Sequence, residues 1–127
     1  MIFYYNLEGN TDTIIAENIG RSLHKIPEQN AMSFVQKIQE KGLIKKFDIH
    51  TGAISDITLA IPGQDQLTWL GSNMLLMSDG NKVFVYRVGS GASWQPVIIE
   101  GDNTMLKGVT RLATNKDNTK LAVVVSE

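Results

Sequence analysis

The sequence of 127 residues contains no cysteine, which excludes disulfide bonds, thiolate nucleophiles and cysteine-ligated metal sites. It also has no excess of charge, because 12 basic residues face 13 acidic ones and the formal net charge is -1. Such a balance provides no field for collecting phosphates, so nucleic-acid binding is not expected. No apolar run approaches the length of a membrane span, and the first residues do not form a signal peptide.

Motifs of catalysis and ligand binding are missing as well. No Gly-x-Ser-x-Gly elbow, phosphate-binding glycine loop or dinucleotide fingerprint occurs in the sequence. The two histidines, His24 and His50, have no local partners with metal-ligand spacing. Asp79-Gly80-Asn81 lacks the further oxygen ligands of a calcium loop and is interpreted as a β-turn. The prediction is therefore no catalytic residue, no metal and no cofactor.

What the sequence does contain is a repeat of short apolar runs that end in turns. One kind of run places an aromatic residue two positions before an aliphatic one and closes with glycine. Its aromatic residues, Tyr5, Phe47 and Tyr86, are 42 and 39 residues apart. The alternation of apolar and polar residues is typical of a strand that enters a hairpin.

A second kind of segment alternates with the first along the whole chain. It consists of a strand, a polar turn and another strand, and its leucines, Leu23, Leu67 and Leu112, are 44 and 45 residues apart. A period in the low forties with four strands per unit is typical of the blades of a β-propeller. We therefore predict an all-β fold.

An α+β fold remains the alternative. Residues 10–12 provide a potential helix cap, and Ile15, Ile19, Leu23 and Ile26 recur at helical spacing. Gly20 interrupts this pattern at a cost of about 1 kcal/mol, and the β-branched residues weaken it further. Residues 34–38 also tolerate a helix.

Taken together, the two kinds of hairpin resemble the TolB-like and WD40-like propeller repeats of bacterial proteins. In that family a Ser-Pro-Asp-Gly turn joins the first two strands of a blade, and an Asp-x-x-Thr-Gly turn joins the last two. The segment Asp48-Ile49-His50-Thr51-Gly52 matches the second turn, whereas the first is degenerate at residues 27–30, 71–73 and 116–118. The resemblance covers nearly the whole chain and implies a fold and a periplasmic or extracytoplasmic setting, but no activity.

The order of the pieces predicts how residues 1–127 divide into blades. Residues 1–17 correspond to the outer two strands of one blade, residues 20–58 and 65–100 to full blades, and residues 108–127 to the inner two strands of another. Three blades are too few for a closed ring, because propellers typically have about four to eight. The chain is therefore either a fragment or one half of a homodimer. The resemblance implies a ring of six blades, and we predict the homodimer.

The predicted function is a non-enzymatic scaffold that binds a protein or peptide. Loops between blades are the expected contact surface, because rigid repeats present them on one face. Tryptophan is also enriched at binding interfaces, and a histidine on an inner strand can line the central channel. The candidate binding residues are Gln64, Asp65, Asp102, Arg111, Trp69 and His24. The alternative is the propeller part of a peptidase or glycan-active hydrolase whose catalytic residues lie outside this chain.

Overall fold

The computed structural model describes residues 2–6, 11–16, 19–64, 66–91, 93–97 and 107–126, with side chains from residue 23 onward. Every regular element in these segments is a β-strand, so the predicted all-β class is confirmed. Among them there is no helix long and apolar enough to cross a membrane. The strands are β1 (Ile2–Asn6), β2 (Thr11–Ala16), β3 (Ile19–Lys25), β4 (Ala31–Ile38), β5 (Lys41–Asp48), β6 (Ile54–Leu59), β7 (Thr68–Leu70), β8 (Met74–Ser78), β9 (Val83–Arg87), β10 (Gln95–Pro96), β11 (Val109–Thr114) and β12 (Leu121–Val125).

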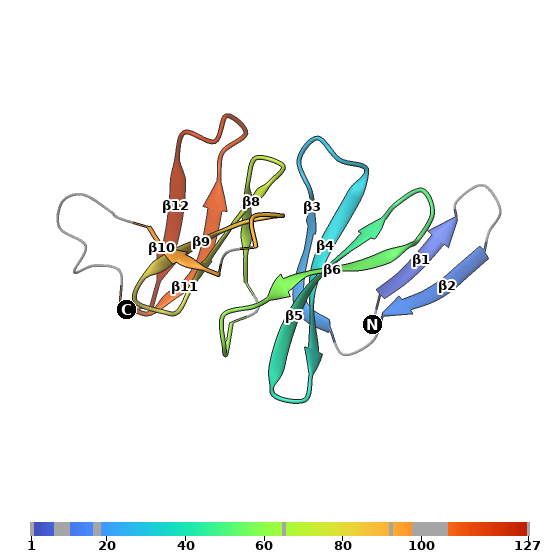
Figure 1. Ribbon diagram of the computed structural model, residues 1–127, viewed down its shortest axis with the longest axis horizontal. Coiled ribbons are helices and arrows are strands. Elements are labelled where there is room, and N and C mark those ends of the chain that lie inside the picture. The colour runs from blue at the N-terminus through green and yellow to red at the C-terminus, as the bar shows by residue number, and fades with distance from the viewer. Residues whose placement is uncertain are drawn as a thin grey trace.

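The described strands form four antiparallel sheets in which chain neighbours are also spatial neighbours. Two sheets have four strands each, in the orders β3-β4-β5-β6 and β10-β9-β8-β7. The other two are the hairpins β1–β2 and β11–β12. Figure 1 shows the hairpin β1–β2 at one end of the molecule, the sheet of β3 to β6 in the middle, and the second four-stranded sheet with the hairpin β11–β12 toward the other end. The molecule is thus a row of sheets that follows the order of the sequence.

The α+β alternative is wrong. The segment expected to be the helix contains the strands β2 and β3, and residues 31–38 form β4. β3 pairs with β4 through opposed residues such as Leu23 and Phe34. Strand pairing overrides the helical spacing because Gly20 and the β-branched residues weaken the helix.

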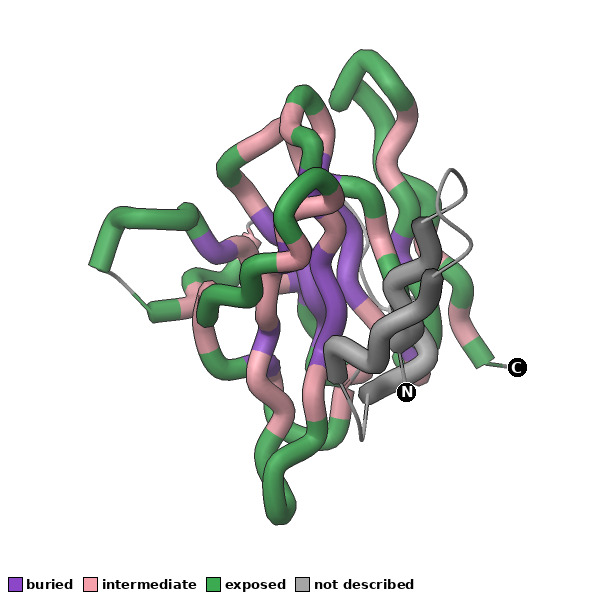
Figure 2. The backbone as a smooth tube through the Cα atoms, turned by 90° about the vertical axis from the view of Figure 1, so that its right-hand side faces the viewer, coloured by how far each residue is buried: buried purple, intermediate pink, exposed green. Residues whose placement is uncertain are grey.

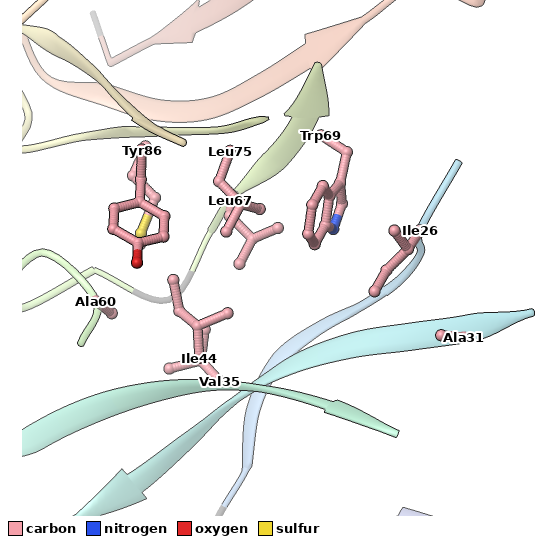
Figure 3. Packing of buried hydrophobic residues seen from close by; sticks show 10 residues of the cluster. Ile26, Ala31, Val35, Ile44, Ala60, Leu67, Trp69, Leu75 and Tyr86 are labelled. Carbon is pink, nitrogen blue, oxygen red and sulfur yellow. The ribbon is translucent and has the colours of Figure 1, made fainter. Parts of the chain in front are cut away.

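The main core lies between the two four-stranded sheets. Val35 and Ile44 of the first sheet, with Ile26 just after β3, face Leu75 of the second sheet and Leu67 just before β7 (Figure 3). Trp69 and Tyr86 lie beside them. In Figure 2 the buried segments accordingly run through the centre, whereas the turns at both ends of the sheets are exposed.

β4 is buried on both of its faces. Val35 points to the core between the two four-stranded sheets, whereas Phe34 points to the opposite face, where its ring centroid lies 6.1 Å from that of Phe47. Alternate residues of a strand point to opposite sides of the sheet, so continuous burial of residues 33–35 requires cover on both sides. The first four-stranded sheet is therefore an internal layer of the row.

A second core joins the second four-stranded sheet to the hairpin β11–β12. Leu76 and Val83 of the sheet pack against Val109 and Leu112 of β11. The Val109 amide also donates a hydrogen bond to the Gly80 carbonyl at 2.8 Å. β11–β12 is therefore the next layer of the row.

The turn between β5 and β6 is held by the Asp48 side chain. Its Oδ1 atom accepts hydrogen bonds from the amides of His50 at 2.8 Å and Thr51 at 2.9 Å. These bonds, that from Thr51 first, lower the pKa of Asp48 below its usual value. Gly52 follows with a φ of 76° and donates to the Asp48 carbonyl. The hydrogen bonds of this Asx turn are all local, because donors and acceptors lie within a few residues of each other.

Asp79 holds the turn between β8 and β9 in the same way. Its Oδ1 atom accepts hydrogen bonds from the amides of Asn81 at 2.9 Å and Lys82 at 2.8 Å, which lower the pKa of Asp79. Gly80, between Asp79 and Asn81, has a φ of 105°. The segment that superficially resembles a calcium loop is thus an Asx turn.

The two-residue turn between β4 and β5 contains a strained residue. Ile38 pairs with Lys41, and Gln39, the first of the two turn residues, has a φ of 57°. Positive φ at this position favours glycine, because a side chain there meets the following carbonyl group. The Gln39→Gly variant is expected to raise the free energy of unfolding by about 0.5–1 kcal/mol in urea titration. Gln39→Ala is the control and should show no such gain, since it retains Cβ; equal gains would contradict the strain.

Candidate binding groove

Three turns lie side by side at one edge of the row of sheets, the upper edge in Figure 1. They connect β3 to β4, β7 to β8 and β11 to β12. Gln29 Nε2 in the first turn donates a hydrogen bond to the Ser72 carbonyl of the second at 3.0 Å. The Gly71 amide in the second turn donates to Asn118 Oδ1 in the third at 3.1 Å. Side chains therefore hold three segments far apart in the sequence as one surface.

A hollow of about 390 Å³ opens between these turns. We name it the turn groove. Pro27 and Glu28 line it on one side and residues of the β11–β12 turn on the other, with Trp69 and Gly71 between. The lining residues are Pro27, Glu28, Trp69, Gly71, Thr114, Asn115, Lys116 and Asn118.

Trp69 is fixed in place at the base of the turn groove. It is buried, and its Nε1 atom donates a hydrogen bond to the buried Ser33 Oγ at 2.8 Å. Its carbonyl accepts a hydrogen bond from Thr114 Oγ1 at 2.6 Å. Trp69 thus contacts partners in the sheets on both sides of its own. The position selected as a candidate interface anchor is mainly a packing position that also reaches the groove.

A second hollow of about 320 Å³ shares Trp69 with the turn groove and lies between the two four-stranded sheets. Gln29 lines it beside Lys46, whose Nζ atom lies 3.4 Å from Gln29 Oε1. Its other contributors come from β6, from the turn between β7 and β8, and from residues in or next to the two four-stranded sheets. They are Ile26, Ser55, Asp56, Ile57, Ser72, Tyr86, Val88 and Gly89.

The charges at both hollows are mixed. The turn groove carries Glu28 and Lys116, and the second hollow carries Lys46 and Asp56. Within the described part of the chain, no group of three or more His, Asp or Glu residues is arranged to hold a metal ion. The groups available to a ligand are thus hydroxyls, amides, backbone groups and single charges, which suit a neutral or zwitterionic polar ligand.

Two of the predicted binding residues, Gln64 and Arg111, do come together. They line a shallow depression with Gln66, Ser78 and the start of β11. Its volume for a ligand is about 0 Å³, and it lies at the opposite ends of β7 and β11 from the turn groove. Asp65 and Asp102 lie outside the described residues.

His24 lies apart from both hollows, on β3 opposite Ser33. Its Nε2 atom is buried and makes no hydrogen bond to any described residue. Burial lowers the pKa of His24, because it disfavours the charged imidazolium. The structure thus brings Trp69, but not His24, to a hollow.

The second tryptophan, Trp94, joins the outer edges of the two four-stranded sheets. Its Nε1 atom donates a hydrogen bond to the Leu59 carbonyl at the end of β6, at 2.9 Å. Its ring lies 5.6 Å from that of Tyr86 between centroids. Trp94 is therefore a clamp between sheets, whereas Gln29 and Trp69 connect the same sheets nearer the turn groove.

Most of the turn groove was not predicted. Glu28, Thr114, Asn115, Lys116 and Asn118 belong to or adjoin the polar turns that the repeat already aligned. A signal was available, because equivalent turns of stacked repeats lie at the same edge. The inter-blade loops were preferred instead, and that choice selected the opposite edge.

Comparisons with protein-family models, curated proteins and solved structures found no match to the chain. The fold and groove therefore define its class without a relative. The protein is an all-β chain of stacked antiparallel sheets with a polar groove along one edge.

Proposed function

We propose that the chain is a segment of a β-propeller and that its sheets are the blades. The support is the repeated four-stranded sheet, with strands in chain order and adjacent sheets packed face to face. Propellers are built from such units around a central axis. The two hairpins then correspond to half blades, β1–β2 to an outer pair and β11–β12 to an inner pair.

On this scaffold we infer a non-enzymatic binding function, with an extended peptide segment of a protein in the turn groove. The observation that carries this function is the set of hydrogen bonds that joins the three turns. A surface held in place before binding loses little conformational freedom when a ligand arrives. Hydroxyl and amide side chains around one acid and one base match the donors and acceptors of a peptide backbone.

The groove's charge also favours a peptide over a polyanion. Glu28 and Lys116 offset each other, and the whole chain has a formal net charge of -1. A nucleic acid or a polyphosphate requires a cluster of basic residues, which the groove lacks among its described residues.

The binding site is tested by charge reversal at Lys116. Peptides are selected from a random display library against the immobilised chain, and their affinities are then measured by calorimetry. Lys116→Glu is expected to weaken binding by about tenfold, because it places a second acid beside Glu28. Lys120→Glu is the matched control and should bind normally, because Lys120 lies in the same turn outside the groove. Loss of binding in Gln64→Ala and Arg111→Ala, but not in Lys116→Glu, would move the site to the opposite edge.

We also propose that the chain assembles as a homodimer. A chain with two complete sheets and two half sheets becomes a ring of six when a second copy supplies the same set. Twofold dimers are the commonest form of soluble oligomer. The expected observation is a dimer mass in sedimentation; a monomer at all concentrations would contradict it.

A further inference from the structure

The two terminal hairpins occupy complementary positions in the repeat. β11–β12 corresponds to β3–β4 and β7–β8, the first two strands of each complete sheet, through the aligned residues Leu23, Leu67 and Leu112. β1–β2 corresponds to the last two strands, through the aligned Tyr5, Phe47 and Tyr86. Each hairpin therefore contains the strands that the other lacks.

The ladders of the complete sheets connect these two alignments in the same way. In the first sheet, the residue two positions after Leu23 is Lys25, which pairs with Met32, and Met32 pairs with Phe47. In the second sheet, the residue two positions after Leu67 is Trp69; it pairs with Leu75, and Leu75 pairs with Tyr86. In both complete sheets, the residue two positions after the aligned leucine is thus connected through the second strand to the aligned aromatic residue of the third strand.

In the last hairpin the same series of paired residues ends at the second strand, β12, among the described residues. The residue two positions after Leu112 is Thr114, which pairs with Leu121 of β12. The repeat places the aligned aromatic residue opposite Leu121, and the third such residue is Tyr5 of β1. The edge of β12 that pairs with no described strand therefore has a defined register with a strand containing Tyr5, and the two strands are antiparallel. Each of the two strands has five residues, so they match in length.

The exposure of the three aligned leucines provides a second observation about the two ends of the row. The three aligned leucines differ sharply in exposure, at 1% for Leu67, 9% for Leu112 and 48% for Leu23. Leu67 and Leu112 are each covered by the sheet that precedes them in the row. Among the described strands, the hairpin β1–β2 is the one that precedes Leu23 in the sequence, and it corresponds to the last two strands of a complete sheet. Leu23 is thus exposed on the side where no described inner hairpin packs against it.

β12 also exposes apolar residues at positions that are buried in β8. Leu121 and Val124 are 37% and 52% exposed, whereas the corresponding β8 positions, Leu75 and Ser78, are 0% and 5% exposed. The β8 positions are covered because β9 continues their sheet and a further layer packs on it. Exposed apolar side chains at both ends of one molecule favour contact between those ends in two molecules.

We propose that β1 of a second copy of this chain pairs with β12, antiparallel and with Tyr5 opposite Leu121. This register also places Tyr4 opposite Ala122 and Phe3 opposite Val123. The inner hairpin of one copy then covers Leu23 of the other, and a twofold axis produces two identical junctions. The pairing specifies the homodimer and rests on the propeller proposed above. The matching register and the paired exposed positions favour a second copy over an unrelated strand.

The register is tested with introduced cysteines, which are unique because the chain has none of its own. The double variant Tyr4→Cys/Ala122→Cys places the two thiols opposite each other, with Cα atoms about 4.5–5.5 Å apart. That distance permits a disulfide, whereas the control Tyr4→Cys/Val124→Cys separates the Cα atoms by more than about 7 Å, which does not. Both are oxidised mildly, after sedimentation and circular dichroism of the reduced proteins.

The expected result is a covalent species of twice the 14.0 kDa chain mass for the first variant and not for the control. A monomer mass for the folded, reduced protein overturns the inference. Cross-linking of the control alone overturns the register, and a dimer that neither variant cross-links overturns the choice of edges. Peptide binding measured on the same preparations separates the two proposals: retained binding without a dimer removes only the pairing, and a dimer without binding removes only the binding function.

Discussion

Replacing Trp69 by alanine is expected to lower the free energy of unfolding by about 3–5 kcal/mol, the range for truncating a large buried aromatic side chain. Trp69 is among the buried residues of the core that joins the two complete sheets. Its removal leaves a cavity there and also leaves the buried Ser33 hydroxyl without the indole donor. The loss should appear as a lower midpoint in urea titration at fixed protein concentration, since association also affects stability.

Two further variants separate packing from hydrogen bonding at this position. Trp69→Phe retains most of the apolar volume and removes the indole N–H, so the expected loss is smaller than for alanine. Ser33→Ala removes the partner, and the double variant should cost less than the sum of the two single ones, because they share one bond. A loss below about 1 kcal/mol for Trp69→Ala would show that the sheets are not held together at Trp69.

The strands and local turns were the most predictable parts of the molecule. The Asp48 turn was identified from the sequence because its bonds are short-range: one carboxylate and two amides within three residues. The strand class also followed from short apolar runs between polar turns. The helical alternative failed at residues 11–25, where pairing of β3 with β4 overrode the spacing of the isoleucines.

The groove was less predictable because its contacts are long-range. The bond from Gln29 to Ser72 spans 43 residues, and that from Gly71 to Asn118 spans 47. No local pattern in these turns encodes a partner so distant. Sequence spacing placed the turns in equivalent positions of the repeat, but only the packing of the sheets showed that a hollow lies between them. The propeller, the homodimer and the bound peptide stay predictions.

A repeat also allows one position to be compared in three environments within a single chain. Leu23, Leu67 and Leu112 occupy equivalent places, so their intrinsic strand preference is similar and their difference in burial reflects the neighbouring layer. In a stacked array, stability is approximately the sum of each unit's own contribution and its contacts with neighbours. The difference in exposure among these three leucines therefore reflects which described layer packs against each of them.

A second large loss of stability is expected when Leu67 is truncated. Leu67→Ala should lower the free energy of unfolding by about 2–5 kcal/mol, because the side chain is almost completely buried between two sheets. Leu23→Ala is the matched substitution at the exposed equivalent. In dilute, monomeric protein its expected cost is below about 1 kcal/mol, since roughly half of that side chain is already in water.

At concentrations where two copies pair, Leu23→Ala should have a larger effect than in the monomer. In the proposed dimer Leu23 is covered by the inner hairpin of the second copy, and Leu23→Ala should raise the dissociation constant of the dimer by about tenfold, equivalent to about 1.4 kcal/mol of lost apolar contact. Leu67 is buried within one copy, so Leu67→Ala should lower the free energy of unfolding without a comparable effect on the dissociation constant of the dimer. Sedimentation across a concentration series distinguishes the two. If Leu23→Ala leaves the dimer unchanged, the inner hairpin of the second copy does not cover this position, and the proposed junction is wrong.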